Sequence, residues 1–147
     1  MNGLASLLNH SEDGIAEGQR LLRECIALRL TILGPRHPDT LTSQHNLASA
    51  LKRLGRLDEA ETICRQTLAV RREVMGPQHL YTLRNIKLLA EILAAKGRFN
   101  EAQESLRTTL EIQRRRLGAE HPETLGTAKM LTQVQKKLEQ TGTPQSP

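Results

Sequence analysis

Hydrophobic and polar positions along this chain recur at the spacing of amphipathic helices. Between residues 44 and 54, positions three, four and seven residues apart form one helical face, made of Gln44, Leu47, Ala48, Leu51 and Leu54. A second run starts near Leu57, and its inner face consists of Ala60, Cys64, Thr67, Leu68 and Val70. Gly55 separates the two runs, and a glycine just past a helix end is a common stop signal. The pattern predicts two consecutive helices and no strand.

This two-helix pattern is repeated along the chain. The segment LGPRHPDTL begins at Leu33, MGPQHLYTL at Met75 and LGAEHPETL at Leu117, each 42 residues after the one before. Residues 33–74 align with residues 75–116 without a gap and share 16 identities. Repeats of 20–50 residues are typical of stacked helical arrays. We therefore expect one all-α array of helix pairs, with full repeats at 33–74 and 75–116.

The two ends of the chain contain incomplete repeats. Residues 1–32 form a partial repeat, in which LASLL (Leu4 to Leu8) resembles the first helix and residues from Ile15 onward match the second. Residues 117–140 supply a terminal first helix, and residues 141–147 are expected to be a disordered tail. The prediction is about seven helices within residues 1–140, the first one short. The polar terminal helix is either a cap or a place where further repeats would follow.

Pairs of small and large residues suggest a known family. Leu47-Ala48-x-x-Leu51 recurs as Leu89-Ala90-x-x-Leu93, and Ala60-x-x-x-Cys64 recurs as Ala102-x-x-x-Leu106. These motifs resemble tetratricopeptide repeats, and the 42-residue period with its LG-P-x-HP-x-T-L linkers is similar to the kinesin light chain subclass. The resemblance implies a right-handed solenoid of antiparallel helix pairs that acts as a non-catalytic scaffold for protein partners. The aromatic residues usual in such repeats are replaced here by aliphatic ones.

In arrays of this family, the first helix of each repeat lines a concave groove that holds a peptide or a partner helix. The stripe opposite the core on each first helix is therefore the candidate binding surface. It comprises Thr42, His45, Asn46, Ser49, Lys52 and Arg53 in one repeat, Arg84, Lys87, Leu88, Glu91, Ala94 and Ala95 in the next, and Gly126, Lys129, Met130, Gln133, Lys136 and Lys137 in the last.

The charge of these stripes suggests the nature of the partner. They contain seven lysines or arginines and one acid, Glu91, a larger basic excess than in the whole chain, which has 21 basic and 16 acidic residues. This predicts a positive groove suited to an acidic, extended peptide segment. The resemblance to clamp-type arrays further implies that Asn46, Lys87 and Lys129 hold carboxylates. A structural alternative is that each stripe is only the solvated face of an amphipathic helix.

Two other functions are compatible with the sequence. The exposed ends of the array could stack on further repeats or on a second copy of the chain. The net charge of +5 would also permit weak nucleic-acid binding, for instance at Arg114 to Arg116. An aromatic content of 1% argues against single-stranded nucleic acid, because such ligands are usually held by stacking on aromatic rings.

Candidate chemistry is sparse, and we expect no enzyme, cofactor or metal site. His37, His79 and His121 recur in register, but equivalent points on stacked helices lie too far apart to share one zinc ion, so we expect these residues to be linker residues that cap helices. Cys25 and Cys64 are expected to be reduced core residues. Neither a signal peptide nor a membrane span is apparent, which predicts a soluble, cytoplasmic protein.

Overall fold

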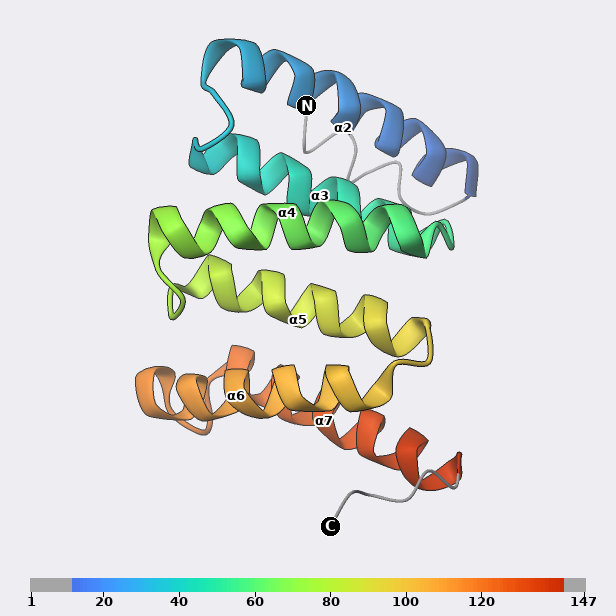
Figure 1. The fold of residues 1–147 in the computed structure, drawn as a ribbon, viewed down its shortest axis with the longest axis vertical. Helices are drawn as coiled ribbons and strands as arrows, with labels where there is room; N and C mark the ends of the chain where they lie inside the picture. The colour runs from blue at the N-terminus through green and yellow to red at the C-terminus, as the bar shows by residue number, and fades with distance from the viewer. Residues whose placement is uncertain (1–11, 142–147) are drawn as a thin grey trace. The chain divides into compact units, whose positions relative to one another are not determined.

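The computed structural model describes residues 12–141. Within this range the chain forms helices joined by short turns and contains no strand (Figure 1). The helices are α2 (Glu12–Ile32), α3 (Pro38–Arg53), α4 (Leu57–Met75), α5 (Leu80–Ala95), α6 (Phe99–Leu117) and α7 (Pro122–Gln140). The predicted all-α class is confirmed, and the helix boundaries differ from the predicted ones by a few residues. The predicted helix at Leu4 to Leu8 and the tail after residue 141 lie outside the described residues.

The chain divides into two compact units, residues 1–85 and residues 86–147, and the division falls inside α5. In the first unit α2 packs against α3, and α3 packs against α4. In the second unit α6 packs against α7. In Figure 1, α2, α3 and α4 follow one another down the view, and α6 passes in front of α7. We describe the two units separately.

The core of the first unit consists of the predicted inner faces. Leu41, Leu51, Ala60 and Cys64 are fully buried, and Leu47, Thr67 and Leu68 are nearly so. Alanine at positions such as Ala60 leaves room for the neighbouring helix, while each buried leucine contributes roughly 1.5–3 kcal/mol. Gln44, Leu54 and Val70, which we also predicted to face inward, are only half-buried. They lie at the edges of the apolar faces, where one side of the residue still meets solvent.

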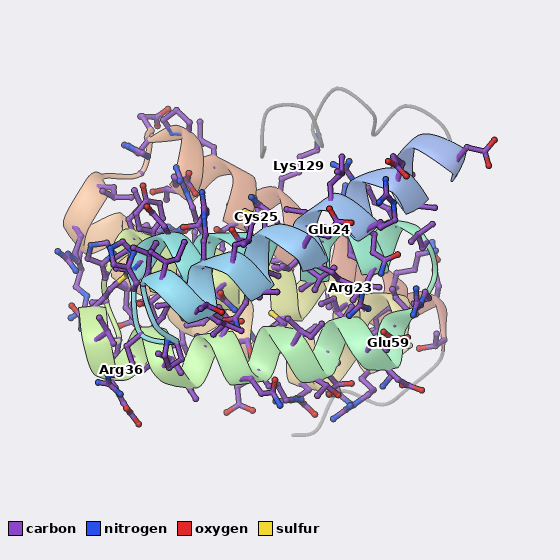
Figure 2. The ribbon with its side chains drawn as sticks, turned by 90° about the horizontal axis from the view of Figure 1, so that it is seen from above. Arg23, Glu24, Cys25, Arg36, Glu59 and Lys129 are labelled. Atoms are coloured by element: carbon purple, nitrogen blue, oxygen red, sulfur yellow. The ribbon has the colours of Figure 1, made fainter. Side chains whose placement is uncertain are left out.

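An ion pair between exposed side chains also connects α2 with α4. Arg23 of α2 and Glu59 of α4 meet with Nη2 and Oε2 3.1 Å apart, and both are labelled in Figure 2. Arg56 also donates to Glu59, and this hydrogen bond holds the pKa of the Glu59 carboxyl below its usual range. Because all three side chains are exposed, these ion pairs orient the side chains but contribute little to the free energy of unfolding.

Each helical pair is connected to the next by a joint, which we define as residues 33–37, 75–79 and 117–121. A glycine with positive φ ends the preceding helix, for example Gly76 at 96°, a conformation that other residues adopt only with strain. Its backbone N–H still donates to the carbonyl of Arg72 at 3.1 Å. The joint therefore ends one helix and turns the chain back without leaving this amide unpaired.

Histidine begins the helix that follows each joint. The imidazole Nδ1 of His37 accepts from the backbone N–H of Asp39 at 3.1 Å, and that of His121 accepts from Glu123 at the same distance. His79 accepts from Tyr81 in the same way, at 3.2 Å. The prediction that these histidines cap helices is confirmed. A ring that accepts at Nδ1 carries its proton on Nε2, so each cap requires a neutral imidazole.

The cap at the third joint can be tested by substitution. We expect His121→Ala to lower the free energy of unfolding by about 1 kcal/mol, because the N–H of Glu123 loses its acceptor. His121→Asn should retain most of that stability, since an asparagine oxygen can accept from the same N–H. Urea unfolding followed by circular dichroism measures both variants. Equal losses in the two would show that the ring matters through packing and not through the cap.

Candidate functional site

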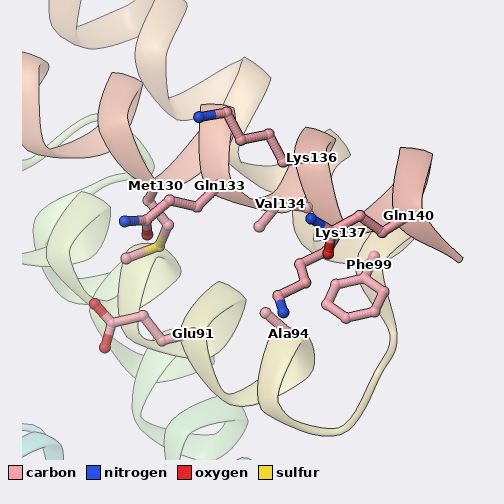
Figure 3. Close-up of a pocket in the computed structure, with 9 residues that line it drawn as sticks. All are labelled: Glu91, Ala94, Phe99, Met130, Gln133, Val134, Lys136, Lys137 and Gln140. Carbon is pink, nitrogen blue, oxygen red and sulfur yellow. The ribbon is translucent and has the colours of Figure 1, made fainter.

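The second unit contains an open groove of about 690 Å³ between α5 and α7. Phe99, the first residue of α6, closes one end, as the close-up in Figure 3 shows. The lining residues are Glu91, Ala94, Phe99, Met130, Gln133, Val134, Lys136, Lys137 and Gln140. Their side chains come from all three helices of this unit, so the groove depends on how these helices pack.

The groove has an apolar floor and a charged rim. Ala94, Phe99, Met130 and Val134 provide the apolar surface, and Val134 is the most deeply buried of them. Lys136 and Lys137 of α7 supply two cations, while the single acid, Glu91, belongs to α5 (Figure 3). A ligand with one apolar side chain between acidic ones would match this arrangement.

Several predicted stripe residues come together here. Glu91, Met130, Gln133 and Lys136 all line the groove, together with Ala94 and Lys137 of the same stripes. Lys87 lies close by, because its Nζ is 3.0 Å from the point where a Cβ on Gly126 would lie. Gly126 thus leaves space on α7 for the lysine of α5. Lys129 is exposed on α7 but is not part of the lining.

Leu88, which we predicted to be part of the binding surface, is largely covered in the structure. Its side chain is only 5% exposed and packs inside the protein. The reason is that α5 is apolar over most of its circumference, with Leu89, Ile92 and Leu93 also buried. On such a helix, the periodicity of the sequence does not show which residues line a groove and which are buried in the interior.

The sequence also missed three lining residues, Phe99, Val134 and Gln140. Phe99 is the first residue of α6, the second helix of its repeat, whereas the predicted groove residues all belong to first helices. Val134 is in register with Ala50 and Ile92, which are core residues, and it is itself 3% exposed. It contributes to both the core and the groove floor.

The stripe residues of the first unit lie in a different environment. Asn46, Ser49 and Lys52 on α3 are half-buried, whereas Arg53 and Arg84 are exposed. His45 turns its Nδ1 toward the side-chain oxygen of Asn85 at 3.4 Å. His45 therefore contacts a buried side chain of this unit.

A buried polar cluster surrounds Asn85, which the sequence analysis did not single out. Asn85 is fully buried, and its Nδ2 donates to the carbonyl of Cys64 at 3.0 Å. Arg71 is 2% exposed and donates through Nη1 to Asn85 Oδ1 at 3.0 Å and to the carbonyl of Tyr81 at 3.1 Å. Burial lowers the pKa of the Arg71 guanidinium, because the charged form loses its hydration. The cluster connects the start of α5 to α4.

The same connection occurs one repeat earlier. Arg29 donates through Nη1 to the carbonyl of Asp39 at 2.7 Å and to Ser43 Oγ at 2.6 Å, and each of these residues lies 42 positions before its counterpart. In the following repeat Gln113 takes the arginine position. Its buried Oε1 has no hydrogen-bond partner among the described residues. The register Arg29, Arg71, Gln113 is visible in the sequence and could have identified this element.

The dependence of Arg71 on Asn85 leads to a prediction. We expect Asn85→Ala to destabilise the protein by about 2–4 kcal/mol, because a buried guanidinium loses an acceptor. The control is Thr127→Ala, because Thr127 lies 42 residues after Asn85, at the equivalent position of the next repeat. Its Oγ1 donates to the carbonyl of Glu123 on its own helix. That variant should lose about 1 kcal/mol. Urea unfolding would contradict the interpretation if the two losses were equal.

The two cysteines occupy buried positions and are not bonded to each other. Cys64 Sγ lies 3.5 Å from the carbonyl oxygen of Asn85, and Cys25 Sγ lies 3.8 Å from Ser43 Oγ. Both thiols thus pack in the core, as predicted. Searches of residues 12–141 found neither a group of three metal-ligating side chains nor a helix long and apolar enough to cross a membrane.

Comparison with protein families identifies the class of protein. A tetratricopeptide repeat model matches residues 43–112 and 84–142, and a second tetratricopeptide repeat model matches residues 1–39. Together these matches cover most of the chain, which belongs to the tetratricopeptide repeat family. A search of curated protein sequences finds no match.

Solved structures indicate the subclass. Two crystal structures of a putative kinesin light chain from Podosopora anserina, described as having nearly identical TPR-like repeats, are each 27% identical to this chain. The alignment with the first has a TM-score of 0.82 and covers 93% of this chain and 69% of the kinesin light chain. The alignment with the second has a TM-score of 0.81 and covers 98% of this chain and 76% of the kinesin light chain. BtubC (BKLC) from P. vanneervenii shares the fold, with a TM-score of 0.78 at 20% sequence identity. That alignment covers 94% of this chain and 56% of BtubC. This tetratricopeptide repeat chain is therefore similar in sequence and fold to the repeats of a kinesin light chain.

Proposed function

We propose that this repeat protein is a non-catalytic interaction scaffold whose α5–α7 groove binds an acidic, extended segment of a partner protein. Tetratricopeptide repeats are protein-interaction modules, so a protein partner follows from the family. The observation that carries the finer proposal is the groove of about 690 Å³, in which an apolar floor is bordered by Lys136 and Lys137.

The groove favours an extended segment with one apolar anchor. In an extended chain, neighbouring side chains point to opposite sides, so an anchor can enter the floor while residues beside it reach the rim. The floor around Met130 and Phe99 would take a side chain the size of leucine, and the two lysines would pair with carboxylates. Each exposed pair contributes only about 0.2–1 kcal/mol, so affinity should depend on the anchor and on salt.

The lysines provide the first test. The probe is an acetylated, amidated peptide of glutamates with one central leucine, and binding is followed by calorimetry and by the methyl resonance of Met130. We expect Lys136→Glu combined with Lys137→Glu to weaken binding about tenfold, because attraction becomes repulsion. A double change at Arg114→Glu and Arg115→Glu, on an exposed end of α6 outside the lining, is the matched control.

The outcomes distinguish the groove from general charge attraction. Equal weakening in both double variants would mean that the peptide responds only to net charge. A Met130 resonance that does not move on binding would place the peptide elsewhere. Replacing the central leucine of the peptide by serine should also weaken binding if the floor takes an anchor. Single-stranded RNA titrated in parallel tests the nucleic-acid alternative.

A second candidate function rests on apolar residues at the end of α2. Ile32 is 75% exposed and Leu28, one turn earlier on the same face, is 54% exposed. Their counterparts 42 residues later, Val74 and Val70, are better covered in α4, which packs against α3. We infer that a second copy of the chain covers this face of α2 through a two-fold contact, in which the same patch serves both copies.

Association through α2 predicts a dimer that a charge disrupts. Light scattering after size exclusion should show a dimer for the wild type at high protein concentration and a monomer for Ile32→Glu. Val74→Glu, at the register position in α4, should leave the dimer intact. A wild type that stays monomeric throughout the concentration series would exclude this second function.

A further inference from the structure

Gly126 lies inside a helix, where glycine is unfavourable. It belongs to α7 (Pro122–Gln140), and a glycine within a helix loses more conformational freedom on folding than an alanine would. No positive φ explains its presence, since the described glycines of that kind lie at helix ends, as Gly97 and Gly118 do. The surroundings of Gly126 supply a different reason.

The space that Gly126 leaves is occupied by the ammonium group of Lys87. The Nζ of Lys87, which reaches across from α5, lies 3.0 Å from the point where a Cβ on residue 126 would lie. Lys87 is half-buried, and within residues 12–141 it has neither a hydrogen bond nor an ion pair. A cation that is partly removed from water without a partner loses hydration that nothing in the chain replaces. An anion from outside the chain would replace it.

Lys129 brings a second cation to the same place. It follows Gly126 by three residues on one face of α7, so the two Cβ positions lie about 5–6 Å apart. The Cβ of Lys129 is therefore within about 9 Å of the Lys87 ammonium group. Lys129, which is labelled in Figure 2, is exposed and has no hydrogen bond or ion pair among the described residues. The flexible stem of a lysine can bring both ammonium groups to one small anion.

The two lysines favour a phosphate over a carboxylate. A phosphorylated side chain carries a charge of roughly −1.5 to −2 at neutral pH and three acceptor oxygens, so a single group can meet both ammonium ions. An ammonium group is a point charge with no preferred plane, whereas a planar carboxylate is best matched by a guanidinium group. No arginine is among the residues that line the adjacent α5–α7 groove.

The apolar floor beside the lysines favours a peptide as the carrier of this phosphate. Met130 lies one turn after Gly126 on α7 and lines the groove (Figure 3). In an extended segment, side chains two residues apart point to the same side and lie about 7 Å from each other. A phosphorylated residue two positions from an apolar anchor would therefore reach Lys87 and Lys129 while the anchor contacts Met130.

We propose that Lys87 and Lys129, on either side of Gly126, bind a phosphorylated side chain of the segment that occupies the α5–α7 groove. Phosphorylation of the partner would then strengthen its attachment. The inference rests on the proposed function in placing a partner segment in this groove. It goes further in naming a modification of that segment, for which carboxylates alone are a weaker substitute.

The test compares phosphorylated and unphosphorylated probes. They are the glutamate peptide with its central leucine and two versions in which phosphoserine replaces the glutamate two residues before or two residues after the leucine. Calorimetry gives the affinities, and the backbone amide resonance of Gly126 reports this site separately from the methyl resonance of Met130. We expect one of the two phosphopeptides to bind wild type about tenfold more tightly than the glutamate peptide. That gain should fall to about twofold or less in Lys87→Gln and in Lys129→Gln.

The variant Gly126→Ala separates binding from folding. Its methyl group would displace the Nζ of Lys87, whereas alanine is the better helix former. We expect the phosphopeptide to bind two- to fivefold more weakly, while the melting temperature rises by about 1–4 °C. Arg115→Gln removes an exposed charge of α6 outside the groove lining and should retain the full gain, which controls for net charge.

The possible results assign failure to one proposal or the other. If the glutamate peptide moves the Met130 resonance but neither phosphopeptide binds more tightly, the phosphate site is wrong and the proposed function stands. A gain that persists in both lysine variants, or in Gly126→Ala at full size, contradicts the phosphate site in the same way. Single-stranded RNA that binds at Gly126 more tightly than the phosphopeptides would assign the lysines to nucleic acid. If no peptide binds wild type by any readout, both proposals are wrong.

Discussion

The fold depends on the joint at which one helical pair ends and the next begins. A glycine with positive φ, as at Gly76, stops a helix in a conformation that side chains disfavour. A histidine such as His79 then accepts a hydrogen bond from a backbone N–H in the first turn of the following helix. The two features lie within a few residues of each other, so the direction of the chain is set locally. Because three joints share this geometry, each amphipathic helix is presented to its neighbour in a similar way.

Variation within the repeated frame gives each repeat its own chemistry. Arg29 and Arg71 make the same pair of hydrogen bonds one repeat apart, which ties a second helix to the start of the next first helix. Gln113 occupies the third position but leaves its oxygen unpaired among the described residues. At the start of α5 the acid found in α3 and α7 is replaced by Tyr81, which lies beside Arg71 and Arg84. These departures distinguish the repeats from one another although their backbone follows the same pattern.

The two units carry their basic side chains in different settings. In residues 86–147 the groove combines an apolar floor with lysines whose flexible side chains adapt to a ligand. In residues 1–85 two arginines, one of them buried, lie beside an aromatic ring. A lysine rim gives salt-dependent attraction with little directional preference, whereas a guanidinium recognises the plane of a carboxylate.

The sequence alone determined the fold class, the repeat period, the helix pairs and the role of the capping histidines. These features follow from local signals, namely helical periodicity, glycine at helix ends and residues in register. It also indicated part of the groove, because Glu91, Met130, Gln133 and Lys136 belong to the outer stripes of first helices. The burial of Leu88 and Arg71 and the place of Phe99 and Val134 in the groove were decided only by tertiary structure. Each depends on which neighbouring helix covers a residue, and periodicity within one helix carries no information about that.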